Sequence, residues 1–575
     1  MATKREFGLF TATDRSPALE GAGGRQVSTL VPATSGLMRF PVALLVGDSA
    51  CQYEPRPEDL RSSFGRGMAF LLGRMEWVED GGGYRFASPV ESRILETALT
   101  LHLLRKEHCE STWQEHLRSY LLRHRNEGDE FSQMVAAAVL GGQQEECLSR
   151  ARRFMGQVEY SKRRKYALML MLLAEVGACP LDVPELALLD PSEFGAQASH
   201  RFSQMYGAAL RLLHARHRGT ALVGTEDATF LRESQAANGS WEQQTLITLV
   251  ALLGLGREAP AFERGLAFLR RLAREDGGIP FCNDQNVWLT ALAGLVLQEA
   301  APQTRELQHQ VARYLVSRQH QSGGWSFTED VMQTDTDNAA NCVQFLSQLD
   351  EELYGEAIDR THRYFLSLQR DDGGYPTYEP AGESEVTMTA NIMLAQSLVL
   401  HRHPHLLAPL RRAFTFLVER QRDDGRFERS WSLSESYSIF RVLWALRHCR
   451  GLVYKREVRR LHERALGYLL QSQQPDGGWG YHTEPPAHAL GTAYALASLT
   501  RIREHCHVEQ ATLDRGLHFL LSQQDAIGEF HSPPDLAGPR PIAFKVPLLS
   551  TVFSLVALTW YQDDALASAR LRWAA

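Results

Sequence analysis

The feature that most constrains this 575-residue chain is a repeat of roughly 50 residues. The segments YLVSRQHQSGGW, YFLSLQRDDGGY and YLLQSQQPDGGW each carry a helical pattern that ends in a glutamine and a glycine-rich turn. A second apolar helix follows each turn, with apolar residues recurring at i, i+3, i+4 and i+7. The turn glycines are Gly323, Gly373, Gly425, Gly477 and Gly528, with weaker copies near Gly82, Gly239 and Gly277.

Two helices per repeat cannot bury their apolar faces alone, so successive pairs must pack on one another in a stack or a ring. We therefore predict an all-α fold of two αα-barrel (toroid) domains. The repeat spacing is regular after Gly277 and irregular before it. This change places one barrel at residues 61–270 and the other at 271–575, with residues 1–60 packing on the second.

The composition excludes several functional classes. A net charge of −7 gives no broad basic surface for nucleic acid. The N-terminal residues lack the apolar run of a secretory signal, and no segment has the uninterrupted apolar length of a membrane-spanning helix. We expect a cytoplasmic protein with no nucleic-acid partner, and the sequence leaves a homodimer open.

The stretch TDTDN, residues 334–338, lies between a Gly-Gly-Trp turn and an apolar helix. Asp335 and Asp337 are two residues apart, and Asn338 follows them. A helix cap with an acidic first turn explains this pattern without any chemistry. Paired carboxyl groups are also the arrangement that raises a pKa and holds a proton for catalysis.

The repeats resemble the QW repeat of class II terpene cyclases, the family of squalene-hopene and copalyl-diphosphate-type cyclases. RGMAFLLGRM, ARYLVSRQHQSGGW and ALGYLLQSQQPDGGW carry this motif. TDTDN lies where that family has Asp-x-Asp-Asp, and RSWSLSESYS is similar to a segment of the diphosphate-retaining members. The resemblance implies the βγ architecture, with a γ-like barrel at 61–270 and a β-like barrel at 271–575.

The resemblance also implies a reaction. Asp337 matches the proton-donating aspartate, Asp335 would keep it protonated, and Asn338 replaces the fourth aspartate of the motif. The implied function is protonation-initiated cyclisation of a linear prenyl diphosphate, farnesyl or geranylgeranyl diphosphate. The product would be a bicyclic drimane- or labdane-type diphosphate.

Such a reaction needs aromatic faces for the cations and positive groups for the diphosphate. We expect the cation-stabilising residues among Trp325, Phe327, Trp431, Tyr437 and Trp479. Lys545 and Arg540 are the candidate diphosphate ligands. The resemblance implies Mg²⁺ as cofactor, and the candidate metal ligands are Glu127, Asp129 and Glu130.

Three alternatives stay open from the sequence. A triterpene cyclase acting on a substrate such as squalene would share the repeats and the aspartates. A protein prenyltransferase β-subunit is another αα-barrel, but its zinc site resembles Asp-x-Cys, which does not occur here. A non-catalytic helical toroid would tolerate the loss of Asp337.

Overall fold

The computed structural model describes residues 57–142, 146–156, 162–183, 186, 200–219, 226–257, 259–380 and 382–574. Residues 53–575 form one compact unit that is mostly helical. Of the N-terminal segment expected at 1–60, all residues before 57 lie outside the described part.

Six inner helices of the C-terminal half form a closed ring. Each packs on the next one along the chain, and the last packs on the first. Because neighbours surround these helices, nearly every side of them is buried, as in the run from Val386 to Gln396. They are α12 (Asn286–Ala300), α14 (Thr336–Leu349), α16 (Val386–Leu398), α18 (Glu435–His448), α20 (Ala489–Ile502) and α22 (Pro547–Ala574).

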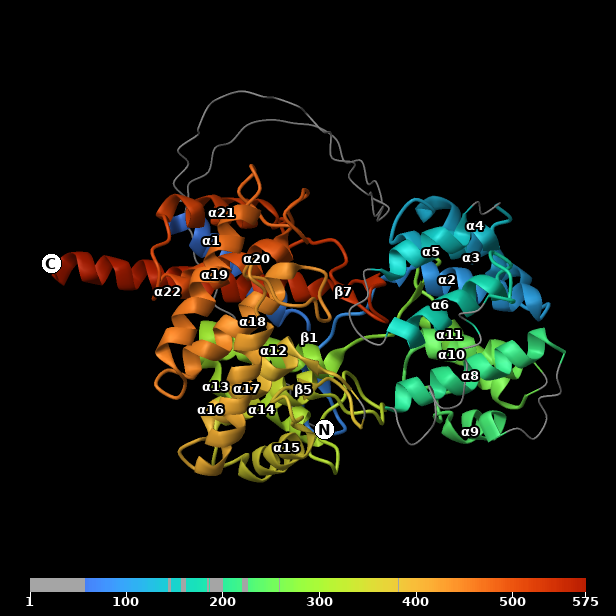
Figure 1. The fold of residues 1–575 in the computed structure, drawn as a ribbon, viewed down its shortest axis with the longest axis horizontal. Coiled ribbons are helices and arrows are strands. Elements are labelled where there is room, and N and C mark those ends of the chain that lie inside the picture. The colour runs from blue at the N-terminus through green and yellow to red at the C-terminus, as the bar shows by residue number, and fades with distance from the viewer. Residues whose placement is uncertain are drawn as a thin grey trace, which may run out of the picture. The chain divides into compact units, whose positions relative to one another are not determined.

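Outer helices alternate with the inner ones along the chain and bury one face each. They are α13 (Arg305–Ser317), α15 (Gly355–Leu368), α17 (Leu407–Arg420), α19 (Lys455–Ser472) and α21 (Gln510–Ser522). The sixth outer position belongs to α1 (Pro57–Leu72), which packs on α22. In Figure 1, α1 is the blue helix among the orange and red helices of this ring.

The repeated glutamine ties each turn to the following outer helix. The Gln319 amide donates to the carbonyl of Gly323, at 3.1 Å, and to that of Ala357 in α15, at 2.9 Å. The Gly323 φ is 93°, and a Cβ there would lie 2.5 Å from the Arg360 carbonyl oxygen, so only glycine fits. The equivalent glutamines are Gln235, Gln369, Gln421 and Gln473.

The last repeat uses the same contact to close the ring. Gln524 donates to the carbonyls of Gly528, at 3.1 Å, and Ser63 in α1, at 2.9 Å. Its side-chain oxygen accepts from the Ser63 hydroxyl at 2.6 Å and from Arg66 at 2.8 Å. The start of the described chain thereby completes the C-terminal barrel.

A smaller ring is built from the preceding part of the chain. Its inner helices pack in order, and α10 packs back on α2: α2 (Ile94–Lys106), α4 (Glu130–Val139), α6 (Lys162–Glu175), α8 (Arg201–His217) and α10 (Thr245–Leu255). The helices outside them are α3 (Ser111–His124), α5 (Cys147–Met155), α9 (Glu226–Ser234) and α11 (Ala261–Leu272). The predicted all-α fold of two αα-barrels is confirmed.

Short antiparallel strand pairs and 3₁₀ turns complete the described part of the fold. β1 (Met75–Val78) pairs with β2 (Gly83–Phe86), and β2 packs on α12 and α13 of the larger ring. β3 (Ser92–Arg93) pairs with β4 (Ile279–Pro280), where the chain enters and leaves the smaller ring. The remaining elements are β5 (Tyr375–Pro376), β6 (Ser384–Glu385), β7 (Leu536–Ala537), β8 (Ala543–Phe544), η2 (Pro302–Thr304) and η3 (Pro404–Leu406).

No helix in the described ranges is long and apolar enough to cross a bilayer. The domain limits at residues 60 and 270 stay predictions, although the contacts of α1 and of the β1–β2 hairpin join residues 57–86 to the larger ring. The homodimer and the cytoplasmic location also stay predictions.

The closure contact can be tested by replacing Gln524. We expect Gln524→Ala to lower the free energy of unfolding by about 1–3 kcal/mol, because buried backbone carbonyls lose their donor. Thermal and chemical unfolding monitored by circular dichroism would measure the change. Gln303→Ala, at an exposed position in η2, is the matched control and should leave stability unchanged. Equal stability of the two variants would show that Gln524 does not hold the ring closed.

Candidate active site

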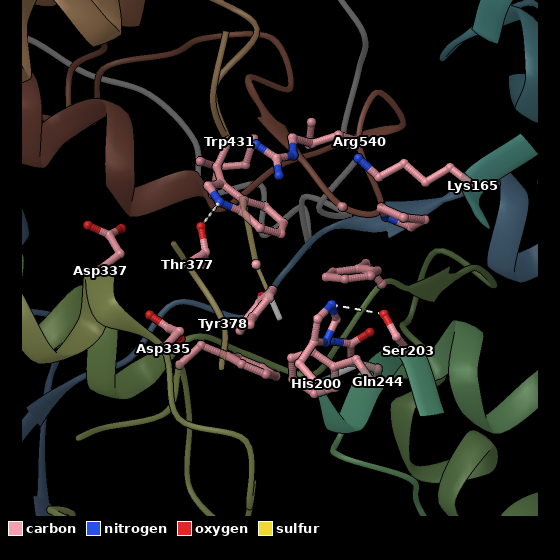
Figure 2. A pocket seen from close by; sticks show the side chains of 18 of the residues that line it. Lys165, His200, Ser203, Gln244, Asp335, Asp337, Thr377, Tyr378, Trp431 and Arg540 are labelled. Carbon is pink, nitrogen blue, oxygen red and sulfur yellow. Dashed lines mark hydrogen bonds between the residues drawn. The ribbon is translucent and has the colours of Figure 1, made fainter. Parts of the chain in front are cut away.

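A pocket lies where both rings contribute side chains. The smaller ring provides the first turns of α6 and α8, and the larger ring provides the starts of α12, α14 and α16 together with residues 536–540. Helix N-termini favour negative charge nearby, so this placement suits both a carboxylate and an anionic ligand. Figure 2 shows Asp335 and Asp337 on one side, Lys165 and Arg540 on the other, and Tyr378 and Trp431 between them.

Asp335 begins α14 and fixes the geometry of the predicted motif. Its main chain donates to the carbonyl of Trp325 at 2.9 Å. Its side chain is the N-cap, accepting from the Asn338 main-chain N–H at 2.8 Å and also from the Asn338 side-chain amide. Asp335 is therefore a helix cap, as the simpler interpretation of the sequence held, and it also lines the pocket.

Asp337 lies in the first turn of α14, with its carboxyl group surrounded by donors. Oδ1 accepts from the side-chain amides of Asn341, at 3.0 Å, and Asn391, at 2.6 Å. Oδ2 accepts from the Trp288 indole N–H at 2.9 Å. The Arg441 guanidinium is 3.7 Å from Oδ1. These four residues come from α12, α14, α16 and α18, so four successive inner helices build this environment.

Removal from water raises the pKa of both carboxyl groups. It raises the pKa of Asp335 to about 8. Burial also raises the pKa of Asp337, while Arg441 and the three donated hydrogen bonds act to lower it. This differs from the expectation that an ionised Asp335 keeps Asp337 protonated, because removal from water is the largest cause for both groups.

Two of the five predicted aromatic residues line the pocket, namely Phe327 and Trp431. The Trp431 indole donates to the Thr377 hydroxyl at 3.0 Å, and the Arg540 guanidinium lies 4.5 Å from its ring centre. Other rings from both barrels complete the wall of the pocket. They are Phe202, Tyr206, Phe281, Trp288, Tyr378 and Phe544.

The other three predicted aromatic residues do not line this pocket, which corrects the expectation. Trp325 and Trp479 are buried, and their indoles donate to the carbonyls of Leu315, at 2.7 Å, and Leu469, at 2.8 Å. Each of these contacts ties a turn to its own outer helix. Tyr437 packs on Tyr494 with ring centres 5.0 Å apart, inside the larger ring.

The positive side of the pocket contains one predicted residue and one that the sequence analysis missed. Arg540 makes a two-point contact with Glu385, at 2.8 and 3.2 Å. Lys165 has a buried Nζ with no hydrogen-bond partner, and burial together with Arg540 lowers its pKa well below the ordinary value. Lys545, the other prediction, forms an ion pair with Glu91 at 2.8 Å and does not line the pocket.

The predicted metal ligands do not form one cluster. Asp129 caps α4 through the Ser132 N–H at 2.9 Å. Glu130 binds Arg150 and Arg153, and Glu127 contacts His124 at 2.9 Å. None of the three carboxylates lines the pocket, and each one has a partner of its own. The structure therefore does not bring them together as a magnesium site.

Sequence signals for the missed residues existed but were weak. Arg441 is a charged residue inside the apolar stretch YSIFRVLWAL, and Asn341 lies one helical turn after Asp337. Asn391 and Trp288 belong to helices of other repeats. Their distance to Asp337 depends on how four helices meet, which local patterns do not encode.

Two family models match the chain. The squalene-hopene cyclase C-terminal domain matches residues 386–563, and the prenyltransferase alpha-alpha toroid domain matches residues 225–430. The matched segments cover the larger ring and the end of the smaller one.

Curated relatives extend the likeness over most of the chain. A drimenyl diphosphate synthase of Streptomyces showdoensis is 33% identical over 494 residues, which is 82% of this chain and 90% of that protein. One of Streptantibioticus cattleyicolor is 32% identical over 495 residues, with the same coverage. The solved ent-copalyl diphosphate synthase from Streptomyces platensis has the same fold, with a TM-score of 0.62 at 18% identity, covering 88% of this chain and 99% of that one.

The two αα-barrels and the likeness to these relatives define a terpene cyclase rather than a passive helical scaffold. The chain belongs to the class II terpene cyclases and is an enzyme. The predicted membership of this family is confirmed.

Proposed function

We propose that this enzyme cyclises linear farnesyl diphosphate to a bicyclic drimane-type diphosphate. The names of its two curated relatives support a C15 substrate over a C20 one. The observation that carries the proposal is the carboxyl group of Asp337, which lines an aromatic pocket whose opposite side is basic.

Asp337 is the Brønsted acid in this proposal. In the neutral acid, Oδ1 is the carbonyl oxygen that accepts two amide N–H groups, and Oδ2 carries the proton while accepting from Trp288. The proton passes to the terminal alkene of the substrate, and the π electrons form the new C–H bond. The same donors then stabilise the carboxylate that is left.

The Asn338 side chain can hydrogen-bond to a protonated Asp335. Its Oδ1 is buried and has no partner, while its amide nitrogen contacts Asp335. A half-turn of this amide lets Oδ1 accept a proton from Asp335, which an ionised fourth aspartate would do only at a higher cost of burial. Replacement of the fourth aspartate therefore tunes the acid pair without removing its function.

The tertiary cations formed by protonation lie among the rings in the middle of the pocket. Tyr378 and Trp431 separate the carboxyl side from the basic side, with ring centres 5.7 Å apart. Ring faces attract positive charge, and they lack the lone pairs that would capture a cation. The alkenes of the chain can then add in turn to close two rings before a proton is lost.

The diphosphate is assigned to the cluster of Lys165, Arg164 and Arg540. A buried ammonium with no partner is costly, and a bound anion removes that cost by charge-assisted hydrogen bonds. In the free enzyme the Glu385 carboxylate pairs with Arg540. The group that a bound anion would stabilise most is therefore the Lys165 ammonium. A hydrocarbon such as squalene offers no group for this cluster.

We propose Mg²⁺ only as an ion that binds together with the diphosphate of the substrate. Mg²⁺ keeps several waters and binds through few carboxylates plus phosphate oxygens. Glu383, an exposed carboxylate that lines the pocket, fits that role. The ion would neutralise part of the diphosphate charge. Glu127, Asp129 and Glu130 do not fit it, because they lie outside the pocket and are engaged elsewhere.

Product analysis tests the proposed reaction. Purified enzyme is incubated with farnesyl and with geranylgeranyl diphosphate, with Mg²⁺ or with EDTA, and products are dephosphorylated and identified. We expect a bicyclic C15 alcohol, Mg²⁺ dependence and no stoichiometric pyrophosphate release. Pyrophosphate release in step with cyclisation would contradict retention of the diphosphate, and full activity in EDTA would contradict the metal.

Replacement of Asp337 tests the acid. Asp337→Asn keeps the size of the side chain but removes the transferable proton, so the rate should fall by at least about 10² to 10⁴. Folding and substrate binding should persist, as measured by thermal unfolding and ligand titration. Asp423→Asn, at an almost fully exposed carboxylate, is the control and should be fully active. Wild-type turnover by Asp337→Asn would mean that the proton comes from elsewhere.

Two lysines provide a matched test of the diphosphate site. Lys165→Met should raise the KM for farnesyl diphosphate about 10- to 100-fold, which is the effect of one lost charged hydrogen bond. Lys545→Met removes the same charge outside the pocket and should leave the KM unchanged. The assignment fails if both variants raise the KM equally, or if neither does.

A further inference from the structure

Arg441 is a buried charge that neither the family comparison nor the proposed reaction explains. It lies in the middle of α18 and is 2% exposed. Burying a guanidinium costs several kcal/mol unless its partners compensate. Within the described part of the chain, the carboxylate in ion-pair range is Asp337, 3.7 Å away, and Nε and Nη1 have no hydrogen-bond partner. Because burial of this guanidinium is costly, we look for a role of Arg441 other than stabilising the fold.

The hydrogen bond from Arg441 goes to Asn341 and not to the acid itself. Nη2 donates to the Asn341 Oδ1 at 2.7 Å. The Asn341 Nδ2 then donates to the main-chain carbonyl oxygen of Asp337 at 2.8 Å and to the side-chain Oδ1 of Asp337 at 3.0 Å. The three side chains therefore form a directed chain from guanidinium to amide to carboxyl.

The direction of this chain matters because an asparagine amide has two nearly isosteric orientations. A half-turn would present Oδ1 to Asp337, and that oxygen can only accept a hydrogen bond. It would then hold the carboxyl proton and oppose its transfer to an alkene. Arg441 excludes this orientation, since a guanidinium donates and never accepts.

The geometry points to Arg441 as a positioning residue for proton transfer: it locks the Asn341 amide so that an N–H group faces Asp337. This inference rests on the proposed function. In the reaction, the locked N–H strengthens its bond to Oδ1 as negative charge develops there. The guanidinium charge at 3.7 Å favours the same carboxylate.

A double-mutant cycle tests the chain of contacts. Arg441→Met and Asn341→Leu should each lower kcat about 10- to 100-fold, a part of the range typical of acid catalysis, with the KM for farnesyl diphosphate within about twofold. The double variant should lose much less than the product of the two single losses, because both substitutions break one chain. Arg441→Lys, which keeps the charge and a donor, should be faster than Arg441→Met.

Arg447→Met is the matched control on the same helix. Arg447 lies over the Trp560 ring, 5.9 Å from its centre, and its replacement should leave kcat unchanged. Thermal unfolding of every variant separates lost activity from lost folding. If Arg441→Met does not fold, the double-mutant cycle is built from Arg441→Lys and Asn341→Leu instead.

The outcomes separate this inference from the proposed function. No bicyclic product from the wild-type enzyme would refute the proposed function. Two results would refute only the role of Arg441 if the wild-type enzyme makes the bicyclic product. One is a double variant whose kcat loss equals the product of the two single losses, and the other is an Arg441→Met variant with a raised KM and an unchanged kcat.

Discussion

The candidate site combines a carboxyl group that is largely removed from water with hydrogen-bond donors that surround it. Burial raises the pKa of Asp337, which favours the protonated form of its carboxyl group. Trp288, Asn341 and Asn391 lower the energy of the carboxylate once the proton has left. In the proposed reaction both conditions are needed, because an alkene is a very poor base and only a strong, protonated acid can protonate it.

The ring of helices supplies this environment. Four inner helices deliver one side chain each to a single carboxyl group, and the N-termini of three of them face the pocket. The glutamine contacts at the turns fix the spacing of neighbouring repeats, so the donors are placed by the whole ring. A loop could not hold three donors and a guanidinium around one carboxyl group with comparable precision.

The smaller ring supplies the pocket with basic side chains and a histidine. Lys165 from α6 and His200 at the N-cap of α8 lie opposite the aspartates, and Arg164 from α6 also lines the pocket. Burial lowers the pKa of His200 to about 3, so this ring adds a neutral imidazole beside the cationic groups. Because Tyr378 and Trp431 lie between the two sides, a substrate bound as proposed would span a carboxyl group, an aromatic section and a basic section in that order.

The sequence by itself determined the repeat, the two helices per repeat, the all-α barrels and the position of the aspartate pair, because periodicity and turn glycines are local properties. It did not distinguish Trp325 and Trp479, which hold their turns, from Trp431, which lines the pocket. It also favoured Lys545, which pairs with Glu91, and missed Lys165 and Arg441. Only the tertiary structure decided these roles, since burial, charge pairing and the direction of a hydrogen bond depend on residues that are distant in sequence and meet when the rings close.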